Sequence, residues 1–432
     1  MQDDVFYESF PEKARALFRK FYSVPFSSSS WDSREYATVW SCLSSGAVAS
    51  GNAVGLLERQ FENTLDARIA KGVNSGEAGL YCILRALKES EGKRQRDEVV
   101  IPSYCCGSVL YAVQNAGLKP VFADIGFDYN LSPESAFEKI SGKTLAVLVP
   151  SLYGKPAALD VFEKKLPKMQ DNGNVFLVDD AAQCLGASKN GKPVGNFGIA
   201  GVHSFGAKAI TATAGGMIVS SNPSHPAVRK ALSIAESLPS EKTSTLIFRL
   251  VDCAMRYSHR KTFLPFLTLK YLAQQKLGRK AVKTYSRLSN LDAEIASAQL
   301  RKVGKINALR RRNAKILLDV LASSEFELPD FEKQHVFYKF AVRLPKKGES
   351  RRTKPWPELR KFVRLMAQRG VECEWCYVPL RLRFSSAEKR GETLPVTEDV
   401  WWRSIALPNH PGLSEEQMKQ VAITAKKTLA EL

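Results

Sequence analysis

A series of short apolar runs, separated by segments of helical spacing, constrains the fold of this chain most strongly. Between residues 41 and 222 the runs lie in "DEVVIPSY", "KPVFADI", "TLAVLVPSLYG" and "NVFLVDDAAQ". Runs of this length, bounded by turn residues, indicate strands that are buried on both faces. Helical segments such as "NSGEAGLYCILRALKES" lie between them. The alternation predicts an α/β fold with a mostly parallel central sheet flanked by helices.

The chain has 432 residues, which suits two or three domains. We predict an N-terminal helical extension over residues 1–40, with the serine run at 27–30 as a linker. A large α/β domain then covers 41–230, and a basic helical connection covers 231–325. Strand and helix patterns alternate from 326 to 432, which predicts a small C-terminal α+β domain.

The positive charge of the chain is unevenly distributed. The formal net charge is +19, and residues 227–320 contain 20 basic and 6 acidic side chains. Such a surface attracts nucleic acid, an anionic membrane or phosphorylated substrates, or it is simply a solvated helical face. No nucleic-acid recognition motif is present, so we expect no nucleic-acid partner. Membrane contact through helices at 245–283 remains an alternative to packing on the core or on a partner subunit.

Eight cysteines are scattered through apolar runs, which is typical of reduced thiols in a cytoplasmic protein. Cys373 and Cys376 form a CxxC, but no second CxxC or histidine pair lies nearby. We therefore predict no metal site and place this pair in a strand. The N-terminus does not resemble a signal peptide, and no run of about 20 apolar residues predicts a membrane-spanning helix.

Polar residues that follow the apolar runs are candidates for a site, because ligands of parallel sheets bind at the carboxyl ends of the strands. "GVNSGEAGL" (72–80) is a turn of small residues that opens a helix. Its free backbone N–H groups and the helix dipole favour a phosphate, although such a turn is often only structural. The backbone of Ser75, Gly76 and Glu77 is therefore a candidate anion site.

Two further stretches add chemistry. "FLVDDAAQCLGA" ends a strand with Asp179 and Asp180, either as a helix cap or with a carboxylate at the mouth of the sheet. "HSFGAKAITATAGGM" places Lys208 among small residues, after Ser204. Small residues let the backbone approach a cofactor closely, and burial there predicts a lowered pKa for Lys208.

Together these features meet the needs of pyridoxal 5'-phosphate. Its phosphate requires a helix N-terminus and hydroxyls, and its ring nitrogen requires a carboxylate. Its aldehyde requires a lysine, and its ring face requires an aromatic or apolar side chain. "PSYCCGSV" (102–109) places Tyr104 just beyond a strand end, where it can supply that face.

The ordered set of motifs resembles the DegT/DnrJ-type sugar aminotransferases, which are fold type I pyridoxal phosphate enzymes. The resemblance runs from about Trp40 to the C-terminus. It rests on "NSGEAGL", "LYGKPAALD", "VDDAAQCLGA", "HSFGAKAITATAGGM", "AEIASAQLRKVGKINALRRRNA" and "WWRSIALPNHPGLSEEQ". It implies a fold type I aminotransferase whose active site lies at the interface of a homodimer.

The resemblance implies a role for individual residues. Lys208 matches the lysine that forms a Schiff base with the cofactor. Asp180 matches the carboxylate at the pyridine nitrogen, and Gln183 matches the contact to the phenolic oxygen. The phosphate-binding positions match Ser204 and the turn at Ser75, Gly76 and Glu77, and the ring-stacking position matches Tyr104 or Cys106.

The chain departs from the family pattern at several positions. Glu77 stands where a threonine or serine is usual, and a carboxylate there must turn away from the phosphate or pair with a cation. The segment from Ser204 to Lys208 is one residue shorter than the common pattern. Tyr285 lies near the place of an asparagine that crosses the dimer interface to the phosphate. These departures bear on the substrate and the rate more than on the cofactor.

The implied function is transfer of an amino group, with glutamate as donor, to a nucleotide-linked keto sugar. The products of such enzymes enter polysaccharides, glycolipids or glycosylated metabolites. One alternative is a sugar dehydratase, although histidine replaces the lysine in those relatives. Another is a non-catalytic or regulatory relative that keeps the fold.

Overall fold

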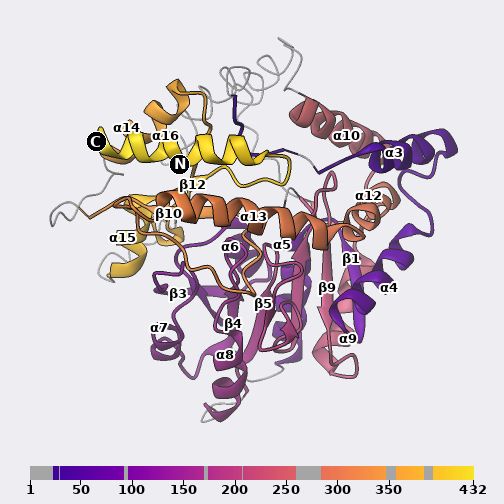
Figure 1. Ribbon diagram of the computed structural model, residues 1–432. Helices are drawn as coiled ribbons and strands as arrows, with labels where there is room; N and C mark the ends of the chain where they lie inside the picture. The colour runs from indigo at the N-terminus through magenta and orange to yellow at the C-terminus, as the bar shows by residue number, and fades with distance from the viewer. Residues whose placement is uncertain are drawn as a thin grey trace.

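The computed structural model describes residues 23–28, 30–91, 96–169, 174–206, 208–258, 284–346, 357–383 and 393–432. A large sheet with its covering helices fills the lower part of the view in Figure 1. Helix α13 (Val303–Leu321) crosses above it, and a smaller C-terminal unit lies on the other side of α13. The candidate site is built where these parts meet.

The central sheet has seven strands in the order β1-β9-β8-β5-β4-β2-β3. The strand pairs from β8 to β3 are parallel, while β9 is antiparallel to both of its neighbours. Because β9 alone is reversed among these strands, it begins at the edge where the others end. The strands are β1 (Ile69–Val73), β2 (Glu98–Pro102), β3 (Lys119–Ala123), β4 (Thr144–Pro150), β5 (Phe176–Asp180), β8 (Ala200–Ser204) and β9 (Gly216–Ser220).

These strands form because their side chains are buried on both faces. All seven residues of β4 and all five of β9 are buried. Helices cover the sheet, and local signals set their ends: Ser132 caps α7 and Gly117, at φ +74°, follows α6. The covering helices are α4 (Ala53–Leu65), α5 (Gly76–Ser90), α6 (Gly107–Asn115), α7 (Pro133–Glu138), α8 (Leu159–Lys165) and α9 (Pro226–Ser237).

Further elements surround this layer. A short 3-10 helix, η3 (Leu166–Lys168), follows α8, and the β6–β7 hairpin joins Ser188–Lys189 to Lys192–Pro193. At the upper right of Figure 1 lie α3 (Ser33–Ser45), α10 (Thr243–Ser258) and α12 (Asn290–Leu300). Asp292 on α12, which is 1% exposed, accepts from Arg249 on α10 and from the Ala214 amide. This ion pair fixes the loop that enters β9.

The C-terminal unit is an antiparallel sheet in the order β10-β12-β11 with helices against it. Helix α16 also packs along α13, as Figure 1 shows. The elements are β10 (Phe340–Arg343), α14 (Pro357–Gln368), β11 (Glu374–Trp375), η4 (Leu380–Arg383), α15 (Pro395–Arg403), β12 (Ser404–Leu407) and α16 (Glu415–Ala430).

The predicted α/β class with a mostly parallel sheet is confirmed. The predicted CxxC strand is short, since β11 consists of the two residues between Cys373 and Cys376. In the part of the chain that the structure describes, no helix has both the length and the apolar character needed to cross a membrane. Part of the predicted membrane-contact segment, 259–283, lies outside the described residues.

The predicted N-terminal helical extension over 1–40 stays a prediction, because residues 1–22 lie outside the described residues. Among its described residues the helix begins at Ser33, and 23–28 have no helical structure. Val24 instead forms a parallel bridge to Val371, and the Phe26 amide donates to Glu372 at 2.9 Å. Residues 23–28 therefore pack on the C-terminal unit, a long-range contact that local sequence patterns do not encode. The proposed boundaries at 40, 230 and 325 stay predictions.

Candidate active site

The candidate residues gather at one edge of the central sheet because parallel strands end there together. Asp180 is the last residue of β5, and Ser204 is the last residue of β8. The reversed strand β9 begins beside them at Gly216. Helix α5 starts three residues after β1 ends, so its N-terminus lies at the same edge. Topology thus assembles residues that are more than 100 positions apart.

The N-terminus of α5 forms a tight cradle with the start of β9. Ser75 is the N-cap, and its hydroxyl accepts from the Ala78 amide at 3.1 Å. A methyl group on Gly216 would come within 2.6 Å of the Gly76 nitrogen, so glycine is required for this approach. A methyl group on Gly76 would lie 3.1 Å from Cβ of Ser204. The helix N-terminus and the Ser204 side chain are therefore neighbours, as a phosphate site requires.

Glu77, in the first turn of α5, is 5% exposed and accepts from the Tyr285 hydroxyl at 3.1 Å. The Asn115 amide donates to the same hydroxyl at 2.6 Å, and the Tyr285 ring packs on Tyr81 at 4.7 Å between centroids. Two departures from the family pattern, Glu77 and Tyr285, are therefore bonded to one another. The hydrogen bond fixes the Glu77 carboxylate beside the Tyr285 hydroxyl.

The adjacent carboxylates of β5 have separate surroundings. Asp179 is fully buried and accepts from the amides of Gly195, at 2.6 Å, and Phe197, at 3.3 Å. It is therefore a structural group that holds the following turn. Asp180 accepts from the Ala182 amide at 3.0 Å and lies near enough to Lys208 to feel its charge. Burial raises the pKa of Asp180 to about 6, against the opposing effects of Ala182 and Lys208.

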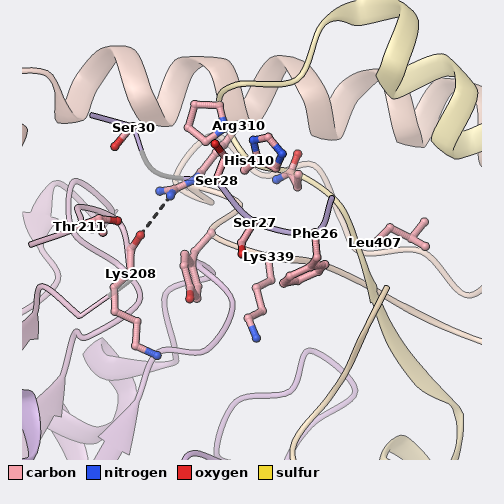
Figure 2. Close-up of a pocket in the computed structure, with 13 residues that line it drawn as sticks. Phe26, Ser27, Ser28, Ser30, Lys208, Thr211, Arg310, Lys339, Leu407 and His410 are labelled. Atoms are coloured by element: carbon pink, nitrogen blue, oxygen red, sulfur yellow. Dashed lines mark hydrogen bonds between the residues drawn. The ribbon is translucent and has the colours of Figure 1, made fainter. Parts of the chain in front are cut away.

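Lys208 lies in the loop between β8 and β9, half-buried, with its amine 5.6 Å from the centroid of the Tyr338 ring. In Figure 2 its amine points away from Arg310, whereas its main-chain oxygen faces Arg310. Burial acts to lower the pKa of Lys208, but Tyr338, Cys106 and Glu374 act together to raise it above its ordinary value. The prediction of a lowered pKa for Lys208 is therefore wrong among the protein's own side chains. The local sequence could not reveal this, because Tyr338, Cys106 and Glu374 come from distant segments.

Gln183 is 4% exposed and has both ends of its amide engaged. Its oxygen accepts from the Tyr153 amide, and its nitrogen donates to the Tyr377 hydroxyl, each at 2.9 Å. Tyr104 is fully buried in the same aromatic group, with its hydroxyl 3.0 Å from that of Tyr153. Cys106 is half-buried before α6 and influences the pKa of Lys208, so this alternative position lies near the lysine.

Three cationic or aromatic side chains beside Lys208 were not among the predicted site residues. Arg310 of α13 donates to the main-chain oxygens of Lys208 and Ala209, each at 3.1 Å. Tyr338 lies under Lys208 and Arg310, and Lys339 donates to Glu374 at 2.7 Å. A helical-spacing signal existed for Arg310, because it falls on the buried face of α13 with Ile306 and Ala314. No local signal singled out Tyr338 or Lys339.

These residues fit pyridoxal phosphate. A backbone cradle at a helix N-terminus, with no room for a Cβ at Gly216, suits its phosphate. The amine of Lys208 and the Asp180 carboxylate stand at the same sheet edge, which suits its aldehyde and its ring nitrogen. The fold and the site together define a fold type I pyridoxal-phosphate-dependent enzyme.

The chain belongs to the DegT/DnrJ/EryC1/StrS aminotransferase family, whose model matches residues 29–425. This match confirms the predicted family, the aminotransferase class and the cofactor. The role of each individual site residue stays a prediction.

Two relatives and one solved structure show what this chain is similar to. The chain is 27% identical to a GDP-perosamine synthase of Vibrio cholerae over 406 residues, covering 92% of this chain and 97% of the relative. It is 31% identical to a GDP-4-keto-6-deoxy-D-mannose 3-dehydratase of Escherichia coli over 201 residues, 46% of this chain and 51% of the relative. The aminotransferase PseC of Helicobacter pylori has a similar fold, with a TM-score of 0.75, 21% identity and coverage of 96% and 100%.

The cradle at Gly216 makes a prediction about cofactor affinity. Gly216→Ala should weaken pyridoxal phosphate binding at least about tenfold, because the new methyl group forces the α5 N-terminus away from the phosphate. Titration of the cofactor by absorbance measures the change. Gly304→Ala on α13 is the matched control, since its added methyl group meets nothing within 4 Å. Equal affinities of Gly216→Ala and wild type would exclude this cradle.

The raised pKa of Asp180 makes a second prediction. Between its unfolded value of 3.8 and about 6, the folded protein holds the Asp180 proton more tightly than the unfolded chain. Ionisation of Asp180 therefore lowers stability as pH rises through this window, and the loss is complete above it. Asp180→Asn should raise the free energy of unfolding of the cofactor-free protein by about 1–3 kcal/mol near pH 7.5, and not near pH 4.

Urea unfolding at the two pH values measures this difference. The control is Asp319→Asn, an exposed carboxylate on α13 beside Lys315, which should change stability by less than about 0.5 kcal/mol at both. A gain for Asp180→Asn that is equal near pH 4 and pH 7.5, or absent at pH 7.5, would contradict the assigned burial of this charge.

Proposed function

We propose that this chain transfers an amino group from glutamate to a nucleotide-linked keto sugar. The observation that carries the proposal is Lys208, whose charge acts on Asp180 and which follows Ser204, the neighbour of the α5 cradle. The matched relative in Vibrio cholerae is named GDP-perosamine synthase, which supports a sugar nucleotide as acceptor. The excess of basic side chains in 227–320 favours attraction of a diphosphate group. Its product would enter polysaccharide, glycolipid or metabolite biosynthesis.

Each residue of the site has a task in this reaction. When bound, pyridoxal phosphate supplies an aldehyde for the amino group and a ring that withdraws electrons. Asp180 would keep the ring nitrogen protonated, and Gln183 would contact the phenolic oxygen. The Lys208 amine would take the proton from the donor's Cα and deliver it to the former aldehyde carbon of the cofactor within the first half of the reaction. In the second half it would make the reverse transfer, from that carbon to the former keto carbon of the sugar. Ser204 and the Ser75–Glu77 backbone would hold the phosphate.

Two alternatives predict different behaviour at Lys208. A dehydratase is disfavoured, because lysine stands at position 208, where such relatives have histidine. A regulatory relative would keep the fold without transferring the amino group. Two contacts support the first proposal: the Tyr285 hydroxyl bonds Glu77, and Arg310 anchors the loop of Lys208. These contacts favour the aminotransferase.

An absorbance spectrum with pyridoxal phosphate tests the proposed function. The wild type should show a visible band that glutamate bleaches, and Lys208→Ala should lack the band because it has no amine to bond the aldehyde. Lys302→Ala is the control, since this lysine pairs with Asp32 and Glu35 on the neighbouring helix. Identical spectra of wild type and Lys208→Ala would refute the aminotransferase, and a band that glutamate leaves unchanged would favour the regulatory relative.

We also infer that the chain forms a homodimer. Large apolar side chains are exposed on α3, where Trp40 is 73% exposed, and on α10, where Phe248 is 60% exposed. These helices lie at the same end of the molecule in Figure 1. Exposed apolar surface of this kind is typical of an interface. One chain has a mass of 48.0 kDa, and light scattering should give twice this value. A measured mass equal to that of one chain would reject the dimer.

We also infer a cytoplasmic location, because no disulfide joins any of the eight cysteines, all of which lie in the described residues, as expected in a reducing compartment. Contact with an anionic membrane through the basic segment at 245–283 would be compatible with this location. Cell fractionation distinguishes the cases. The protein should appear in the cytosol, or with membranes from which salt releases it, and its recovery outside the inner membrane would refute the location.

A further inference from the structure

A small cavity lies behind the loop that carries Lys208. Its volume is about 60 Å³, and it is lined by the N-terminal segment, by α13 and by the loop after β12. Figure 2 shows Ser27 and Ser28 crossing it, with Arg310 and His410 on the side of α13. The lining residues are Phe26, Ser27, Ser28, Ser30, Lys208, Thr211, Arg310, Tyr338, Lys339, Leu407, Asn409, His410 and Pro411.

The cavity lacks negative charge. None of the thirteen described residues that line it is acidic, whereas Lys208, Arg310 and Lys339 are cationic. Lys339 has a carboxylate partner in Glu374, at 2.7 Å. Arg310 has none among the residues that the structure describes. The lining therefore contains a cation without a counter-ion.

Arg310 is the most constrained of these groups. It is 6% exposed, and its guanidinium donates to the main-chain oxygens of Lys208 and Ala209. Its Nε is buried and has no hydrogen-bond partner in the described chain. Burial lowers the pKa of Arg310 to about 10, so the group still carries its charge at neutral pH. A buried charge without a counter-ion is unfavourable unless a ligand neutralises it.

The chemistry and the size of the cavity limit what it can bind. Guanidinium groups favour carboxylates and phosphates, and the serine hydroxyls of residues 27, 28 and 30 add donors. Sites for drug-sized molecules measure roughly 300–1,000 Å³, so a whole sugar nucleotide does not fit here. We propose that this cavity is an oxyanion subsite, in which Arg310 binds one small carboxylate or phosphate group of a substrate.

Two substrates of the proposed reaction can supply this group, so the assignment of a source rests on the proposed function. One source is a carboxylate of the amino donor, whose amine must reach the aldehyde near Lys208. The other is a phosphate of the sugar nucleotide. Arg310 and Lys208 lie 5.5 and 5.6 Å from the centroid of the same Tyr338 ring, so the cavity and the Lys208 amine adjoin one side chain.

Calorimetry with two unreactive probes tests the subsite, with pyridoxal phosphate present so that the phosphate cradle is filled. Glutarate carries the two carboxylates of glutamate without its amine, and inorganic phosphate represents the sugar nucleotide. Binding of one probe should weaken at least about tenfold in Arg310→Gln and recover partly in Arg310→Lys, which restores the charge. Arg312→Gln is the matched control, because it bonds Asn313 and Leu413 instead.

A second variant separates binding from the anchoring of the Lys208 loop. Ser27→Asp places a carboxylate at the exposed rim of the cavity without touching the contacts between Arg310 and Lys208. It should weaken probe binding at least about tenfold while the visible cofactor band stays unchanged. Arg310-dependent binding of glutarate assigns the donor carboxylate, and Arg310-dependent binding of phosphate assigns the sugar nucleotide.

Probe affinities that are unaffected by both Arg310→Gln and Ser27→Asp would overturn the subsite. The proposed function fails on a different readout, which is the absence of a Lys208-dependent band. If Arg310-dependent binding persists without that band, the subsite stands and the aminotransferase does not.

Discussion

The site depends on how strand β5 ends with two carboxylates in succession. Successive side chains of a strand point to opposite faces, so Asp179 and Asp180 enter different surroundings. Asp179 accepts from the amides of Gly195 and Phe197 and fixes the turn that leads to β8. Asp180 is left at the sheet edge, where Lys208 shifts its pKa. Asp179 therefore stabilises the turn that supports the site, and Asp180 is the carboxylate available for its chemistry.

The site gathers more charge than its own groups neutralise. Lys208 lowers the pKa of Asp180 through its charge, and Lys339 pairs with Glu374, but Arg310 has no carboxylate partner in the described chain. Both pKa directions in the β5 pair are upward because burial penalises the negative form. The protein bears these costs at its active site, where substrate and cofactor groups supply the missing partners. A core that served stability alone would not retain these buried charges.

The sequence predicted the elements that depend on local patterns. The buried runs before Pro102, Pro150 and Asp180 became parallel strands, and the turn at Ser75 became the N-terminus of α5. It could not predict which distant segments complete the site. Tyr338 and Lys339 come from the C-terminal third, and Ser27 and Ser28 from a stretch interpreted as a linker. Arg310 is intermediate, because helical spacing on α13 marks it as inward-facing, yet three adjacent arginines concealed which one is buried.

The loop that carries Lys208 shows how such distant contacts offset a local departure. By the resemblance to the family, the segment from Ser204 to Lys208 is one residue shorter than the common pattern, and contacts from outside the loop hold it. The Trp31 indole donates to the Thr211 oxygen at 2.7 Å, and Arg310 holds the oxygens of Lys208 and Ala209. The loop is thus fixed from the N-terminal segment and from α13 at once. Because Arg310 also lines the cavity, an anion bound there would act directly on the residue that holds Lys208 in place.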